Sequence, residues 1–155
     1  MSMVLSKKSA SKRLYAPFPE ELWELIENAD YLTLYLLYPE FSAAYEGKQT
    51  FHGYPVLRQV ELDEEESLTK VVEVLRKGIY GKSNPKRCWV PHHGIRTVAG
   101  SKSVDLVMCF VCEVMQYFVS PRSKKFVWGQ VGKLPKKVLN GILRKTGIPP
   151  GTDLD

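Results

Sequence analysis

Hydrophobic positions along the chain repeat with two periods, and the helical period occurs in three segments. One helix is predicted to begin near Pro19, a second after Asp63 and a third near Pro135. The second is the most clearly marked, because Asp63 and Glu66 have the spacing of a capping box ahead of its apolar positions. Those positions are Leu68, Val71, Val72, Leu75 and Ile79.

The remaining apolar segments favour strands. Strands are predicted over residues 31–38, 51–62, 88–98, 103–119 and 125–131, with a glycine-containing turn at 99–102 between the third and the fourth. Helices and strands thus follow the order α-β-β-α-β-β-β-α. This order predicts an α+β fold with a mostly antiparallel sheet and helices packed on it. Residues 1–14 are predicted to be a disordered basic arm, 15–150 a single domain and 151–155 a tail.

The predicted hairpin contains a cluster of cysteine and histidine residues. If Val98 pairs with Ser103, Arg96 lies opposite Asp105 and His92 opposite Cys109, on the same face as Cys88. His93 and Cys112 then lie on the other face. Cys109 and Cys112 form a C-x-x-C motif, but strand alternation would separate them, which argues against a zinc site made of Cys88, His93, Cys109 and Cys112.

Three cysteines are an odd and low number for a secreted disulfide scaffold. We therefore expect reduced thiols that pack as small apolar side chains, and a cytoplasmic protein. Two alternatives stay open: the four-residue metal site, and a catalytic Cys109 with His92 as its base. No cofactor is expected, and no membrane association, because the longest apolar run, 104–119, is short and carries charges.

Three segments resemble a family of uncharacterised bacterial proteins whose motifs are FHGYxVLG, CFxPRHGIR and DLVICFEC. They are Phe51–Leu57, Cys88–Arg96 and Val104–Cys112, and the similarity covers about residues 50–150. The chain departs from the pattern at Trp89, His92 and Val111. The resemblance implies no activity, but it implies that the polar residues His52, His93, Arg96 and Asp105 are not random.

These four residues are therefore our candidates for a ligand site, together with Tyr54, which the sequence places beside His52 at the start of a strand. An opposite-charge pair such as Arg96 and Asp105 also stabilises a sheet without binding anything. The alternative of a purely structural role is open for each of them.

Charge is unevenly distributed along the chain. The net charge is +5, with a balance of −3 over residues 1–85 and +8 over residues 86–155. Such asymmetry can indicate an anionic partner, and lysines interleaved with aromatic residues can bind nucleic acid. The candidates for that role are Lys124, Lys125, Lys133, Lys136 and Lys137, although Phe126 and Trp128 are expected to lie in the core.

The leading prediction is a small cytoplasmic interaction or regulatory domain that binds a protein partner or a small polar ligand. Nucleic-acid binding through the basic C-terminal half is the second hypothesis. The third is a metal-dependent or thiol-dependent enzyme built on the Cys/His hairpin. No phosphate-binding glycine loop or hydrolase motif occurs, so an enzyme is less expected than a binding domain.

Overall fold

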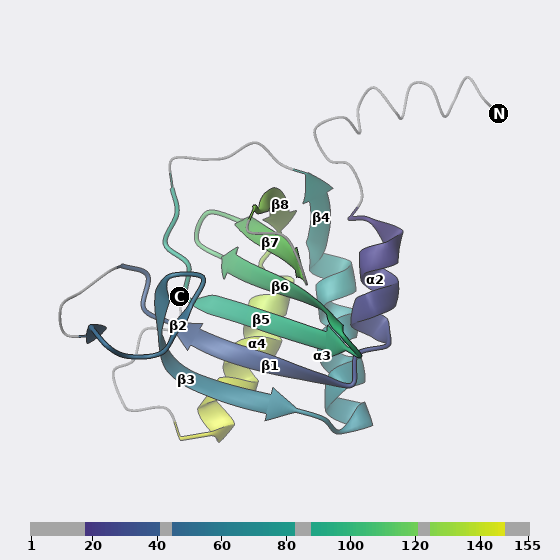
Figure 1. Ribbon diagram of the computed structural model, residues 1–155, viewed down its shortest axis with the longest axis horizontal. Coiled ribbons are helices and arrows are strands. Elements are labelled where there is room, and N and C mark those ends of the chain that lie inside the picture. Colours follow the sequence, from purple (N-terminus) through teal and green to yellow (C-terminus); the bar gives the residue numbers. More distant parts are fainter. Residues whose placement is uncertain (1–17, 41–44, 83–87, 121–124, 148–155) are drawn as a thin grey trace.

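The computed structural model describes residues 18–40, 45–82, 88–120 and 125–147. Their strands form one antiparallel sheet of eight strands in the order β2-β3-β1-β5-β6-β7-β8-β4 (Figure 1). The strands are β1 (Tyr31–Leu37), β2 (Thr50–Phe51), β3 (Tyr54–Leu62), β4 (Ile79–Lys82), β5 (His93–Ala99), β6 (Lys102–Cys109), β7 (Val114–Ser120) and β8 (Val127–Val131).

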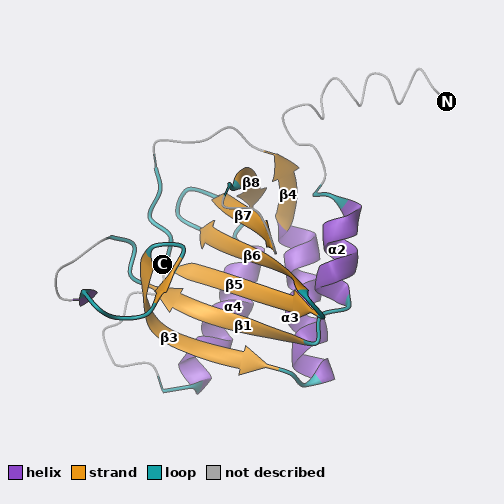
Figure 2. Cartoon of the chain, viewed as in Figure 1, coloured by secondary structure: helices purple, strands orange, loops and turns teal. Residues whose placement is uncertain are grey.

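The helices in the described residues all lie on one face of this sheet (Figure 2). They are α2 (Glu20–Glu27), α3 (Glu65–Gly78) and α4 (Leu134–Lys145). The predicted α+β fold, a mainly antiparallel sheet with helices packed on it, is thereby confirmed. Within the described residues, no helix has the length and apolar character that crossing a membrane requires.

Both faces of the central strand β1 are buried. Leu32, Leu34 and Leu36 point toward the helices and join the main core. Tyr35 and Leu37 point the other way and join a second apolar cluster with Phe51, Val107 and Phe118. Side chains on both faces are therefore apolar, which explains why the sequence YLTLYLL shows no alternation. We call the side of the sheet without helices the open face.

The predicted register of the central hairpin is confirmed for residues 93–99 and 102–108, whereas the predicted pairing of His92 with Cys109 lies beyond the paired residues of β5 and β6. Arg96 pairs with Asp105, Val98 with Ser103 and Ala99 with Lys102 across β5 and β6. Gly100, in the turn, has a φ of 61°, a conformation that costs glycine little because it has no Cβ. The hairpin thus follows from local sequence signals.

Several predicted boundaries are wrong. The strand predicted over 103–119 is two strands, β6 and β7, joined by a turn at 110–113 in which Glu113 has a φ of 58°. The strand predicted over 51–62 is likewise divided by a tight turn, with His52 at a φ of 49°. The strand predicted from residue 88 begins only at His93, and β4 was not predicted. The predicted arm at 1–14 and tail at 151–155 lie outside the described residues.

Helix α3 begins two residues later than its predicted cap. Glu64, not Asp63, is the N-cap residue, and no side chain caps it. The acidic residues Glu65 and Glu66 in the first turn and Arg76 and Lys77 in the last still complement the helix dipole. Helix α4 begins at Leu134, one residue before Pro135, as expected for a proline in a first helical turn.

Candidate functional site

Three of the predicted site residues meet on the open face. Asp105 of β6 accepts two hydrogen bonds from Arg96 of β5, from Nε to Oδ1 at 2.9 Å and from Nη2 to Oδ2 at 2.7 Å. The Nε2 atom of His52, in the turn between β2 and β3, lies 2.8 Å from Oδ2 of the same carboxylate. Arg96 and His52 thus share one carboxylate, although His52 lies 53 positions from Asp105 in the chain. We call these three residues the polar cluster.

Asp105 is held in its charged form in this cluster. Burial alone would raise the pKa of Asp105, but the hydrogen bonds from Arg96 and His52 outweigh it, and the pKa lies below its ordinary value. The hydrogen bonds that Arg96 donates to Asp105 in turn raise the pKa of Arg96. The Asp105 side chain is 7% exposed and that of Arg96 is 42% exposed. The negative charge of the pair is therefore buried, whereas the positive charge reaches solvent.

Aromatic rings fix the position of the polar cluster. The His52 ring stacks on Phe118, with the ring centres 3.6 Å apart and an interplanar angle of 9°. The guanidinium of Arg96 lies over the Phe51 ring, with its Cζ atom 5.4 Å from the ring centre, which is a cation–π contact. Phe51 in turn stacks on Tyr35. The cluster is therefore closely packed against aromatic rings.

The other two predicted ligand residues do not join the polar cluster. Tyr54 lies on the same face, but its hydroxyl accepts a hydrogen bond of 2.6 Å from the indole Nε1–H of Trp89. His93 is fully buried on the helix side, where its Nε2 lies 2.6 Å from Oδ1 of Asn140 in α4. His93 thus connects the sheet to a helix, and only Arg96, Asp105 and His52 stand together.

The polar cluster has the features of a structural ion pair with one solvent-facing edge. Its carboxylate is fully engaged by two cationic or polar partners, which is how buried charge is normally accommodated. Arg96 and His52, 23% exposed at its side chain, are the groups that a polar ligand could contact.

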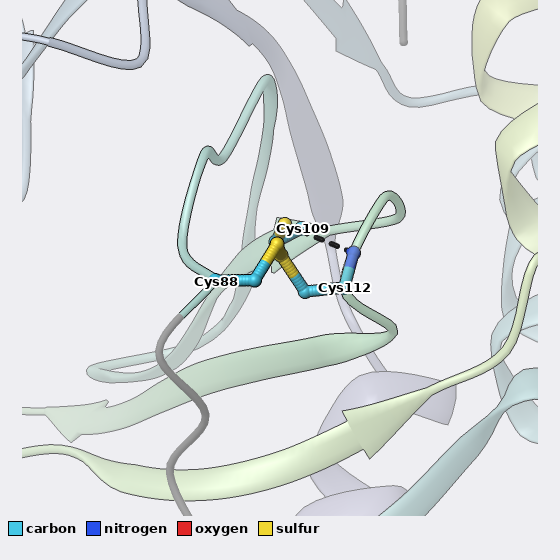
Figure 3. Close-up of side chains that lie close together, drawn as sticks. All are labelled: Cys88, Cys109 and Cys112. Carbon is cyan, nitrogen blue, oxygen red and sulfur yellow. Dashed lines mark hydrogen bonds between the residues drawn. A yellow bond between two sulfur atoms is a disulfide. The ribbon is translucent and has the colours of Figure 1, made fainter.

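The three cysteines, by contrast, converge (Figure 3). The sulfur atoms of Cys88, Cys109 and Cys112 all lie within 4.8 Å of one another. Cys88 and Cys112 form a disulfide, with their Cα atoms 5.7 Å apart, and Cys109 is a buried free thiol. The backbone N–H groups of Cys112 and Val90 donate to the Cys109 sulfur at 3.3 Å and 3.5 Å.

Two predictions about the cysteines are therefore wrong. Cys109 and Cys112 do not lie on opposite faces of one strand, because the turn at 110–113 separates them and reverses the chain. The thiols are also not all reduced packing residues, since Cys88 and Cys112 are bonded. No simple sequence signal marks Phe110-Val111 as a turn; the C-x-x-C spacing itself was the available indication.

The four-residue metal site also loses one proposed ligand. His93 is on the helix side of the sheet, bonded to Asn140, whereas Cys109 packs with Val114 and Trp128 on the open face. Within the described residues, the group of potential ligands gathered here consists of the three thiols. Structural zinc takes four ligands, so these residues supply an incomplete set.

The basic residues predicted for nucleic acid lie in two places. Lys133, Lys136 and Lys137 are at the start of α4, and Lys125 precedes β8; Lys124 lies outside the described residues. Phe126, expected in the core, is 42% exposed, so that prediction is wrong. Trp128 is half-buried and contacts Trp89 edge to face. An exposed aromatic ring thus stands next to an exposed lysine.

A groove between α2 and α3 was not predicted. It encloses about 700 Å³. Its floor is apolar, and charged side chains surround it. The lining residues are Ile26, Glu27, Ala29, Asp30, Asp63, Glu65, Leu68, Thr69, Val72, Glu73, Arg76 and Lys77. They come from both helices and the segments beside them, so only packing brings them together.

No protein-family model, curated protein or solved structure matches this chain.

Proposed function

We propose that this protein is a small interaction domain that binds a basic segment of a partner protein in the groove between α2 and α3. The observation that carries the proposal is an apolar floor enclosed by an acidic rim. A volume of about 700 Å³ lies in the range of grooves that hold a ligand or a few side chains of a partner. The proposal includes a cytoplasmic location, which the odd and low number of cysteines favours.

The floor of the groove offers apolar anchoring. Leu68 and Val72 are only partly buried and pack against the main core, to which the buried Ile26 belongs. Leu68 and Val72 are four residues apart on α3, so they form one continuous stripe on the same helix face. Apolar side chains spaced at i, i+3 or i+4 on a partner helix can pack along such a stripe.

The rim selects the charge of the partner. Among the lining residues, five carboxylates face two cations, and one of the cations, Arg76, is paired with Glu20 and Glu27. The groove is thus locally acidic although the whole chain carries a net charge of +5. Complementary charges speed association and reject partners of the wrong sign, so lysine-rich or arginine-rich segments fit.

The proposal can be tested with a model ligand. We expect a labelled amphipathic peptide of leucine and lysine to bind in fluorescence anisotropy, and a leucine/glutamate peptide of the same pattern not to bind. Val72→Gln should weaken binding by about tenfold or more, which corresponds to about 1.4 kcal/mol. Glu73→Lys should weaken it several-fold, with a smaller effect at high salt, because surface charges are screened.

Matched controls lie on β3, away from the groove. Leu57 is an exposed apolar residue and Glu61 an exposed carboxylate, so Leu57→Gln and Glu61→Lys repeat the same chemical changes elsewhere. These two variants should bind like the wild type. Equal affinity of all four variants, or equal binding of both peptides, would rule out the groove as the binding site.

A second candidate function is nucleic-acid binding, favoured by the exposed Phe126 beside Lys125. Stacking of bases on aromatic rings together with cationic contacts is how single strands are held without sequence preference. A labelled oligonucleotide should then bind at low salt and be released steeply as salt rises. Phe126→Ser should weaken that binding, and absence of binding at low salt would eliminate this candidate.

A further inference from the structure

We infer that Cys88, Cys109 and Cys112 form a thiol–disulfide exchange site that reacts with external thiols. The inference concerns the open face of the sheet and does not depend on the groove between α2 and α3. Cys88 is distant in the chain from the other two cysteines, and a turn separates Cys109 from Cys112. Their three sulfur atoms nevertheless lie within 4.8 Å of one another (Figure 3). A purely structural disulfide would need two cysteines and no third thiol beside it.

The fold assembles the site from three separate segments. Cys88 precedes β5, Cys109 is the last residue of β6 and Cys112 lies in the turn before β7. The pairing of Cys109 with Val114 fixes the ends of that turn, and Glu113 takes the left-handed conformation that closes it. Around the sulfurs, Trp89, Val90 and Trp128 form an apolar wall.

Exposure assigns a different role to each cysteine. Cys88 is exposed, Cys112 is 8% exposed and Cys109 is fully buried. A thiolate from solution can therefore reach the disulfide most readily at the Cys88 sulfur. Its attack forms a mixed disulfide with Cys88, breaks the bond to Cys112 and releases Cys112 as a thiolate, which takes up a proton from water.

A second thiolate then completes the exchange. If it comes from solution and attacks the external sulfur of the mixed disulfide, Cys88 leaves as a thiolate and takes up a proton from water. The two external thiols end as a disulfide, and Cys88 and Cys112 end as the reduced pair. Two electrons move from the external thiols to the protein, so no other oxidant is needed. The protein accepts these electrons in its existing disulfide.

Cys109 provides an internal alternative. Loss of its proton gives a thiolate that can attack the Cys112 sulfur, forming a Cys109–Cys112 disulfide and releasing Cys88, which takes up the proton. Electrons and atoms balance within the chain, because one disulfide replaces another. The N–H groups of Cys112 and Val90 hold the Cys109 sulfur beside the bond that it would attack. This isomerisation would present Cys88 to solvent as a free thiol.

The proposed cytoplasmic location is consistent with a Cys88–Cys112 disulfide that forms and breaks reversibly. In the cytosol, disulfides are usually transient and belong to catalytic or redox-sensing sites, whereas permanent ones occur in oxidising compartments. Exposed disulfides are also the ones most readily reduced. The exposure of Cys88 therefore favours exchange over a permanent staple.

The test uses the whole chain equilibrated in glutathione buffers of graded oxidised-to-reduced ratio. Samples are quenched with acid, alkylated and mapped by mass spectrometry of peptides. We expect Cys88–Cys112 in the most oxidised buffers, and glutathione on Cys88 with some Cys109–Cys112 at intermediate ratios. In a parallel experiment, a small protein that carries a dithiol replaces glutathione, and the oxidation rates of the two thiols are compared. The thiol that is oxidised faster shows whether the substrate is a protein or a small molecule.

Variants separate the roles. Cys109→Ala keeps a small apolar side chain in the core and should abolish the isomer while leaving Cys88–Cys112 and the glutathione adduct. Cys88→Ser should leave Cys109–Cys112 as the bond formed on oxidation and prevent the adduct. Circular dichroism spectra equal to that of the wild type would show that the variants are folded.

Two outcomes would overturn the inference. The first is Cys88–Cys112 as the sole species at every ratio, reduced only when the protein unfolds and unchanged in Cys109→Ala; this would make it a structural disulfide. The second is one equivalent of zinc or copper bound to the reduced protein and lost in every cysteine variant; this would make the cluster a metal site. Peptide binding in the groove, measured in parallel, reports separately on the proposed function.

Discussion

Arg96 and Asp105 stand directly opposite each other on β5 and β6 and are joined by two hydrogen bonds of 2.9 Å and 2.7 Å. His52 contacts the same carboxylate from a turn far away in the chain. The pair therefore links a local hairpin to a long-range contact. Its loss would affect both the hairpin and the packing of the β2–β3 turn on the open face.

The acid dependence of stability should report on Asp105. Because the pKa of Asp105 is lower in the folded protein than its ordinary value of 3.8, its contribution is fully present above that value. It is lost as the pH falls through the lower folded pKa. Asp105→Asn should lower the free energy of unfolding by about 2 kcal/mol at neutral pH, because charge-assisted hydrogen bonds are lost. The free energy of unfolding of this variant should also fall less steeply as the pH is lowered.

Urea unfolding from about pH 7 down to about pH 2.5 measures this dependence. Glu61→Gln removes an exposed carboxylate from β3 and serves as the control, with an expected change within about 0.5 kcal/mol. If the free energy of unfolding of Asp105→Asn falls with pH as steeply as that of the wild type, other carboxylates determine the acid sensitivity.

Gly94 lies where a side chain would collide with a packed aromatic ring. A Cβ built there would lie 2.6 Å from Cδ2 of Phe51, whose ring stacks on Tyr35. Gly94→Ala must displace that ring and should destabilise the protein by about 1–3 kcal/mol, as overpacking does. Thermal or urea unfolding measures the change.

Gly141 supplies the opposite control within α4. A Cβ at Gly141 would meet no atom within 4 Å, so Gly141→Ala should stabilise the protein by about 0.5–1 kcal/mol through helix propensity. Equal effects of the two alanines would contradict the close packing of Phe51 on β5.

The hydrogen bond between His93 and Asn140 should connect the sheet energetically to α4. Both side chains are buried, and their atoms lie 2.6 Å apart. Asn140→Leu should lower the free energy of unfolding by about 1–3 kcal/mol, because it removes the Oδ1 atom that accepts a hydrogen bond from the buried Nε2–H of His93. In a double-mutant cycle with His93→Leu, the coupling energy should fall between about 0.5 and 3 kcal/mol. Simple additivity of the two changes would show that the bond contributes no specific stability.

Local sequence patterns were sufficient for much of the architecture. The apolar spacing that predicted α3 and the turn glycine at 100 that predicted the β5–β6 hairpin are both signals carried by a few neighbouring residues. The register of that hairpin, and with it the pairing of Arg96 with Asp105, followed from the turn position alone. Strand alternation then placed His93 on the face opposite Asp105.

Tertiary structure decided the remaining features. The turn between Cys109 and Cys112 interrupts an apolar run that locally reads as one strand, and it forms because β7 pairs back on β6 while its side chains enter the core. Contacts of His52 with Asp105, and of α2 with α3 around the groove, join segments far apart in the chain. Sequence periodicity determined which residues face inward; only long-range packing, which no local pattern encodes, determined which of them meet.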